Sequence, residues 1–134
     1  MNLDKKSLKV ILENISSIAL IGASPNPKRD SHKVMKFLID KGYKVFPVNP
    51  NHADNKILGN KCFSNLRDIN QKIDMVDIFR AKEFVMEITK DAIKKGVEVI
   101  WTQEGIVDKK SSQLAKDSDI IFVMNECPKK ILEN

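Results

Sequence analysis

The residues best suited to ligand chemistry lie in one polar stretch near the N-terminus, Gly22-Ala23-Ser24-Pro25-Asn26-Pro27-Lys28-Arg29-Asp30-Ser31. Gly22 permits backbone dihedral angles and a close ligand approach that a side chain would block. Asp30 or Ser31 can cap a following helix, whose free N–H groups and positive dipole end favour an anion. Lys28 and Arg29 add positive charge there, and arginine can bind phosphate through two parallel hydrogen bonds. The stretch predicts a phosphate-binding loop, although a glycine in such a turn can also serve packing alone.

The type of ligand is narrowed by what this loop and the next strand lack. Gly22 is the only glycine of the loop, so the G-x-G-x-x-G fingerprint of dinucleotide sites is missing. The second predicted strand ends in Val48-Asn49-Pro50, where an NAD site carries an acid for the ribose hydroxyls. The absence of that acid fits a ligand whose ribose carries a phosphate. An NAD(P)-binding oxidoreductase or redox sensor remains the alternative.

Short β-branched apolar runs alternate with amphipathic segments along the chain, which is typical of βαβ units. We therefore expect one α/β domain over residues 1–134, Rossmann-like and doubly wound. Its mainly parallel sheet of five to six strands would carry helices on both faces, in strand order 3-2-1-4-5-6. In such sheets ligands bind beyond the carboxyl ends of the strands.

The elements follow from the spacing of the apolar residues. The predicted strands are 17–22, 43–49, a short edge strand around Cys62 that follows a turn within 57–63, 73–79, 97–102 and 120–124. The predicted helices are 4–14, a segment that stops at Gly42, a segment that closes at Gly96, and about 108–117, with one helical turn at 65–69. The helix before Gly96 should carry on one side Phe84, Val85, Ile88, Ala92 and Ile93.

Composition places few limits on the function. The 134 residues carry a net charge of +5 and a pI near 9.2, which favours an anionic partner or reflects solvated surface lysines. No basic arm or helix-turn-helix pattern supports nucleic-acid binding. The chain has no apolar run long enough for a membrane and no secretory signal, so we expect a cytoplasmic protein. Cys62 and Cys127 are isolated and predict free thiols, and no His/Cys cluster suggests a metal site.

Several segments, in order along the chain, carry a resemblance to a known family. These segments are Ile21–Arg29, Gly42–Pro50, Ile57-Leu58-Gly59, Val76–Arg80, Trp101–Gly105 and Asn125-x-Cys127-Pro128. Together they resemble the stand-alone CoA-binding proteins, which are similar to the N-terminal CoA-binding domain of the succinyl-CoA synthetase alpha subunit. No single motif is decisive, but the ordered set covers nearly the whole chain from residue 17 onward.

This resemblance implies a role for each matching residue. The CoA pyrophosphate would be held by Gly22, Ala23, Ser24, Arg29, Ser31 and His32. The adenosine would be flanked by Val48, Asn49 and Pro50, and its 3′-phosphate would be bound by one or more of Lys28, His52, Lys56 and Arg80. The adenine or pantetheine path would be lined by Phe79 and Arg80, the pantetheine arm by Gln103, Glu104 and Gly105, and its thiol end by Asn125 and Cys127.

Each of these side chains also has a purely structural interpretation. Phe79 can belong to the core, Arg80 can be a solvated helix-start residue, and Glu104 can be a loop or cap acid. His32 fits a surface or capping residue better than a catalyst. Asp74 and Asp77 are three apart on a strand and so face opposite sides, which favours hydrogen-bonding groups over a catalytic pair.

No nucleophile elbow, metal site or convincing acid–base pair is visible in the sequence. In the synthetase, catalysis depends on a histidine in a further domain and on a second subunit. The resemblance therefore implies binding of CoA or acyl-CoA without catalysis. Cys127 is the one residue that could add chemistry, by forming a mixed disulfide with CoA, and its alternative is an inert, partly buried thiol.

Overall fold

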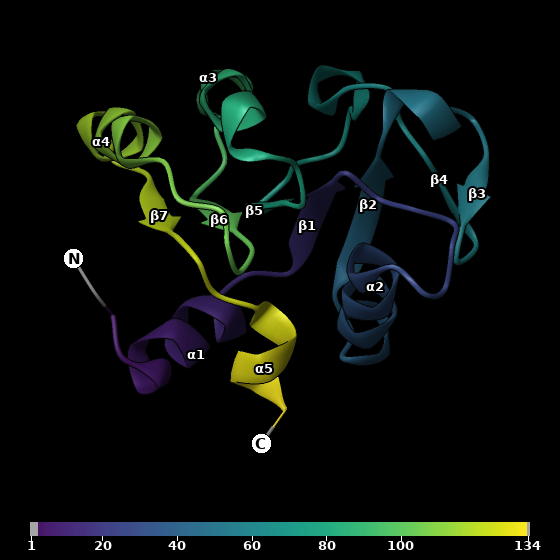
Figure 1. Cartoon of the computed structure of the whole chain (residues 1–134), viewed down its shortest axis with the longest axis horizontal. Coiled ribbons are helices and arrows are strands. Elements are labelled where there is room, and N and C mark those ends of the chain that lie inside the picture. Colours follow the sequence, from purple (N-terminus) through teal and green to yellow (C-terminus); the bar gives the residue numbers. More distant parts are fainter. Residues whose placement is uncertain (1–2, 134) are drawn as a thin grey trace.

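A parallel β-sheet forms the centre of the computed structural model, which describes residues 3–133 (Figure 1). Its strands are β1 (Ser17–Ile21), β2 (Lys44–Val48), β5 (Met75–Ile78), β6 (Val99–Thr102) and β7 (Ile121–Val123). They lie in the order β2-β1-β5-β6-β7, and every neighbouring pair is parallel. The central strands are buried along nearly their whole length, as expected for a sheet covered on both faces.

Helices cover both faces of this sheet (Figure 1). One face carries α1 (Lys5–Glu13), α2 (Asp30–Asp40) and α5 (Pro128–Leu132), and the other carries α3 (Val85–Lys95) and α4 (Lys109–Asp117). Each layer has its own apolar cluster, and Trp101 is the largest fully buried side chain on the α1/α2/α5 face. The fold is the α/β Rossmann-like architecture that the sequence predicts, with helices on both faces of the sheet.

The third predicted strand is wrong. Residues 56–61 form a small antiparallel hairpin, β3 (Lys56–Ile57) and β4 (Asn60–Lys61), and one parallel bridge from Phe63 to Val48 is its link to the main sheet. Leu58 and Gly59 between the two strands have φ values of 51° and 80°. Positive φ at both central residues is the geometry of a tight hairpin turn, so a turn within 57–63 is confirmed. The edge strand expected after this turn is reduced to the single bridge at Phe63.

Three further differences concern helix ends. The N-cap of α2 is Arg29, so neither Asp30 nor Ser31 caps this helix as the sequence suggested. Phe84 is 41% exposed and ends a 3₁₀ turn (Lys82–Phe84) before α3, so it does not belong to the buried side of that helix. Helix α5 was not predicted, because five residues are too few to show a helical period.

Two acidic residues at β5 have opposite environments. Asp74 accepts hydrogen bonds from the Ser16 and Ser17 N–H groups (2.8 and 3.2 Å). Burial acts to raise the pKa of Asp74, but these hydrogen bonds and nearby Lys72 outweigh it and lower that pKa. The prediction of a hydrogen-bonding group is confirmed for Asp74.

Asp77 lies between Leu20 and Trp101 in the register of the sheet and is fully buried. Neither of its carboxyl oxygens has a partner among the described residues, so the predicted hydrogen-bonding role is wrong here. Burial raises the pKa of Asp77 well above its ordinary value of 3.8. Burial in the centre of the sheet therefore favours the neutral form of this carboxyl group.

Replacement of Asp77 by valine should stabilise the protein by about 1–3 kcal/mol near neutral pH, because an unpartnered buried polar group is removed. The folded-state pKa of Asp77 is raised, so the wild type should lose stability as pH rises above about 4, whereas the variant should lose less. Urea unfolding at pH 4 and pH 8 measures both effects. An Asp77→Val protein that is less stable than wild type at pH 8 would contradict this account, and Asp74→Asn, which should destabilise, is the matched control.

Candidate functional site

The predicted phosphate-binding loop is tied to the end of β2. The backbone N–H groups of Gly22 and Ala23 both donate to the Val48 carbonyl, at 2.9 and 3.3 Å. The Asn49 side-chain amide donates in return to the Ala23 carbonyl at 2.8 Å, and its oxygen accepts from the Asn51 N–H at 3.0 Å. Asn49 therefore acts as a brace between the two loops that follow β1 and β2.

Gly22 is required by the neighbouring strand. Its φ is +92°, and a Cβ atom built there would lie 2.5 Å from the carbonyl oxygen of Phe79. The space beside Gly22 is thus filled by the chain itself, whereas the sequence suggested that it is kept free for a ligand. This close approach brings the ends of β1 and β5 together at the carboxyl edge of the sheet.

The loop beyond Gly22 is held in shape by its own polar groups. Ser24 Oγ accepts from the Asn26 N–H at 3.1 Å, and Asn26 Oδ1 accepts from the Lys28 N–H at 3.0 Å. His32 Nδ1 lies 2.9 Å from the Ser24 carbonyl. Because a carbonyl only accepts, Nδ1 is the donor in this hydrogen bond. His32 therefore fastens the loop to the first turn of α2.

The N-terminus of α2 opens directly above this loop. Arg29 occupies the N-cap position and makes no side-chain capping bond. The first N–H groups of the helix and its dipole are therefore available to an anion. Lys28 and Arg29 are exposed beside this opening, whereas Ser31 is buried at 6% exposure.

A second group of predicted residues lies further along the same edge. The hydrogen bonding between strands continues one residue past the ends of β5 and β6. The Phe79 N–H donates to the Ile21 carbonyl (2.8 Å), and the Gln103 N–H donates to the Ile78 carbonyl (3.2 Å). Gly22, Phe79 and Gln103 thus form one row across β1, β5 and β6, which we call the edge row. Gln103 is buried at 7% exposure, and its Oε1 has no partner among the described residues.

The loops after β6 and β7 are bonded to each other. Asn125 Oδ1 accepts from the Gly105 N–H at 2.6 Å, and the Asn125 N–H donates to Thr102 Oγ1 at 3.1 Å. Glu104 forms an exposed ion pair with Lys130 of α5 at 2.9 Å, and this hydrogen bond raises the pKa of Lys130. Glu104 therefore joins the loop after β6 to α5.

A cavity of about 260 Å³ lies at the carboxyl edge on the α3 face. Val48, Pro50 and Arg80 line it, and the Arg80 guanidinium carbon lies 4.1 Å from the centre of the Phe84 ring. The sequence did not indicate the other lining residues, which include Ser64, Arg67 and Phe84 and the two acidic residues Glu87 and Asp91. The cavity is smaller than the roughly 300–1,000 Å³ of drug-sized ligand pockets, so it suits one ring system.

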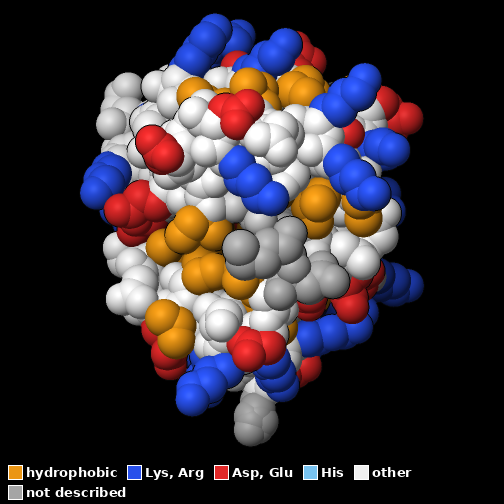
Figure 2. Space-filling model, turned by 90° about the vertical axis from the view of Figure 1, so that its left-hand side faces the viewer, with side chains coloured by type: hydrophobic (Ala, Val, Ile, Leu, Met, Phe, Trp, Pro, Cys, Tyr) orange, Lys and Arg blue, Asp and Glu red, His pale blue; other side chains and the backbone are white. Residues whose placement is uncertain are grey.

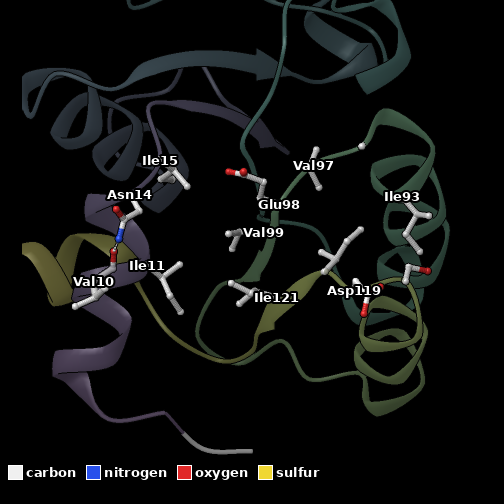
Figure 3. Close-up of a pocket in the computed structure, with 13 residues that line it drawn as sticks. Val10, Ile11, Asn14, Ile15, Ile93, Val97, Glu98, Val99, Asp119 and Ile121 are labelled. Carbon is white, nitrogen blue, oxygen red and sulfur yellow. Dashed lines mark hydrogen bonds between the residues drawn. The ribbon is translucent and has the colours of Figure 1, made fainter.

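Two larger cavities, of about 690 and 710 Å³, lie along the opposite part of the sheet, beside the edge strand β7. Hydrophobic side chains gather on this face of the molecule, with positively and negatively charged side chains around them (Figure 2). Figure 3 shows the first cavity, where Val10 and Ile11 of α1 lie across from Ile93 and Ile121. Neither cavity contains a predicted site residue or an arginine, so we do not place a phosphate ligand there.

Among residues 3–133, no group of three or more His, Cys, Asp and Glu side chains could hold a metal ion. The same part of the chain has no helix that is both long and apolar enough to cross a membrane.

Comparison with known proteins now identifies the family. Residues 16–133 match the family model of a CoA binding domain. The chain belongs to this CoA-binding family. A curated relative, the uncharacterized protein YneT of Bacillus subtilis, is 34% identical over 128 residues, which cover 96% of this chain and 93% of the relative.

CoA-binding domains of this kind also occur inside larger enzymes. The acetate–CoA ligase (ADP-forming) I subunit alpha of Pyrococcus furiosus is 34% identical over 93 residues, or 66% of this chain, but the match spans only 20% of that subunit. A solved structure of a hypothetical protein from Pyrococcus horikoshii is similar over 98% of this chain and 92% of its own, with 39% identity and a TM-score of 0.92. The predicted family and fold are confirmed, and the family supports CoA rather than NAD(P) as ligand.

Replacement of Gly22 by alanine should lower the free energy of unfolding by about 1–3 kcal/mol. The new side chain would have to adopt a positive φ, and its Cβ atom would clash with the Phe79 carbonyl oxygen. Gly96 is the matched control, because its φ is +82° but a Cβ there would meet nothing within 4 Å. Urea unfolding should show a larger loss for Gly22→Ala than for Gly96→Ala. Equal losses would mean that the approach to Phe79 does not constrain the fold.

Proposed function

We propose that this protein binds coenzyme A or an acyl-CoA, without catalysing a reaction, at the carboxyl edge of its sheet. The observation that carries the proposal is the uncapped N-terminus of α2, flanked by Lys28 and Arg29 and placed above a loop that holds its own shape. Such a helix start offers free N–H groups and positive charge to a diphosphate.

The pyrophosphate would lie between this helix start and the loop. Ser24 Oγ already accepts one hydrogen bond, so its hydroxyl proton is free to donate to a phosphate oxygen. Arg29 would supply two further donors from the rim. The backbone of Gly22 and Ala23 and the side chains of Ser31 and His32 would complete the enclosure, as the family resemblance implies.

The adenosine would enter the 260 Å³ cavity beside Val48 and Pro50, with Asn49 bracing the loop behind it. The predicted ligands of the 3′-phosphate were Lys28, His52, Lys56 and Arg80. The cavity places Arg80 on its wall and adds Arg67, which the sequence did not suggest. Two arginines at one cavity can bind a phosphomonoester strongly, since each can form paired hydrogen bonds.

The pantetheine arm would run along the edge row, past Phe79 and Gln103, towards the loops that contain Glu104, Gly105, Asn125 and Cys127. Its amide groups need hydrogen-bond partners, and Gln103 Oε1 is a buried acceptor without one among residues 3–133. An unsatisfied buried acceptor of this kind is costly to the free protein and would gain from an amide donor.

The absence of catalysis is supported by the titratable side chains, which are engaged in structural contacts or enclosed in the sheet. His32 is fastened to the Ser24 carbonyl, Glu104 is paired with Lys130, and Asp74 accepts hydrogen bonds from the backbone. Asp77 is enclosed in the sheet. None of these pairs a free base with an accessible nucleophile. A cytoplasmic location, as predicted from the sequence, would suit such a CoA-binding protein.

Replacement of Arg29 by alanine should weaken CoA binding by about 1–3 kcal/mol, because a charged hydrogen bond to the pyrophosphate is lost. Isothermal titration calorimetry with CoA measures the change, and NADH and NADPH should bind more weakly than CoA to the wild type. Lys36→Ala is the control, since Lys36 also lies on α2 but pairs with Asp40 away from the loop. An Arg29→Ala protein that binds CoA as tightly as wild type would contradict this placement of the pyrophosphate.

Arg80 and Arg67 can be tested with dephospho-CoA, which lacks the 3′-phosphate. Wild-type protein should bind CoA more tightly than dephospho-CoA by about tenfold, the effect of one charged hydrogen bond. This preference should shrink in Arg80→Ala or Arg67→Ala, while the affinity for dephospho-CoA changes less. Competition calorimetry gives both affinities, and an unchanged preference in both variants would remove this cavity from the proposed site.

A further inference from the structure

Cys127 lies where the loops after β6 and β7 meet. The residue before it, Glu126, donates its N–H to the Thr102 carbonyl at 3.2 Å and accepts from the Trp101 indole N–H at 2.9 Å. Cys127 is the N-cap of α5 and packs in the same cluster as Ala23 and Trp101, with 7% of its surface exposed. The thiol is therefore close to the carboxyl edge, on the face covered by α2 and α5.

Gln103 gives a second and independent indication of a ligand at this place. Side chains alternate along a strand, so Gln103 faces the same side of the sheet as Trp101, which is the side of Cys127. Only 7% of the Gln103 surface is exposed, yet its Oε1 has no hydrogen-bond partner among the described residues. A buried acceptor in this position calls for a donor that the chain does not supply, and an amide N–H of pantetheine is such a donor.

The pantetheine arm is long enough to reach Cys127 along the edge. From β1, where the phosphates would lie, to β6, where Glu126 bonds to Thr102, there are two strand spacings, or about 10 Å at about 4.8 Å each. The arm has about as many bonds as four residues, which extend to about 14 Å. A CoA whose diphosphate lies at α2 and whose arm follows the edge row would bring its sulfur to the region of Cys127.

We propose that Cys127 forms a mixed disulfide with CoA, which makes this site a redox-sensitive CoA carrier. The inference rests on the proposed function. The Cys127 thiolate attacks one sulfur of CoA disulfide, a Cys127–CoA disulfide forms, and the original S–S bond breaks. The second CoA leaves as a thiolate and takes up the proton that Cys127 lost. CoA disulfide is the oxidant, and a small thiol reverses the reaction.

Cys62 is a control within the same chain. It is fully buried, and its thiol lies 3.6 Å from the Asn49 carbonyl oxygen. Burial raises the pKa of the Cys62 thiol, which disfavours the thiolate needed for exchange. Modification should therefore occur at Cys127 and leave Cys62 unchanged.

The test is intact-mass spectrometry of the reduced full chain after incubation with CoA disulfide. The expected result is a gain of one CoA, reversible by dithiothreitol, which persists in Cys62→Ser and disappears in Cys127→Ser. Peptide mapping of the wild-type adduct locates the modified cysteine even if Cys127→Ser folds poorly. The rate should exceed that with glutathione disulfide by at least about tenfold, because binding raises the local concentration. Adenosine 3′,5′-bisphosphate should slow it by occupying the nucleotide site.

Calorimetry on the same sample separates the two proposals. CoA binding without an adduct, an adduct on Cys62, or equal rates with glutathione disulfide would each overturn the Cys127 inference and leave CoA binding intact. No heat of CoA binding in the wild type would overturn the proposed function itself.

Discussion

The contact between Gly22 and the Phe79 carbonyl is the constraint on which the site depends. A Cβ at residue 22 would lie 2.5 Å from that oxygen, so a residue without a side chain is required where β1 meets β5. The Val48 carbonyl on the other side accepts from both Gly22 and Ala23. These contacts fix the chain at Gly22 and Ala23 between its two neighbouring strands. The loop that follows leads away from the sheet to the uncapped start of α2.

Asp77 and Gln103 are two buried, unpartnered polar side chains on the same face of the sheet, and they differ in whether a ligand can reach them. Asp77 lies inside the sheet between Leu20 and Trp101, where no ligand can reach it, and burial raises the pKa of its carboxyl group. Gln103 lies two rows further towards the carboxyl edge, where a ligand could supply the missing donor. Buried polar groups without hydrogen-bond partners occur most often at functional sites. Gln103 fits this pattern better than Asp77, because it lies closer to the carboxyl edge.

The sequence was most informative where a residue's type determines its local geometry. The continuous apolar run of β1 and the glycine that follows it predicted the central strand and the turn at its end. The third strand was mispredicted because positive φ at Leu58, a residue that rarely adopts it, closes a hairpin.

Other features depend on tertiary structure and have no local signal. Arg67 and Phe84 reach the 260 Å³ cavity only because two short 3₁₀ turns lie at the same edge of the sheet. The missing partner of Asp77 depends on which residues lie opposite it in the neighbouring strands. Such placements follow from strand order and register, which a single sequence does not specify.

A crystal structure of the full chain grown with coenzyme A tests the central claim most directly. The diphosphate should lie at the first turn of α2, within hydrogen-bond distance of Ser24 and Arg29, with the adenine towards Val48. An ordered CoA at the β7 edge, with the loop after β1 empty, would contradict the account.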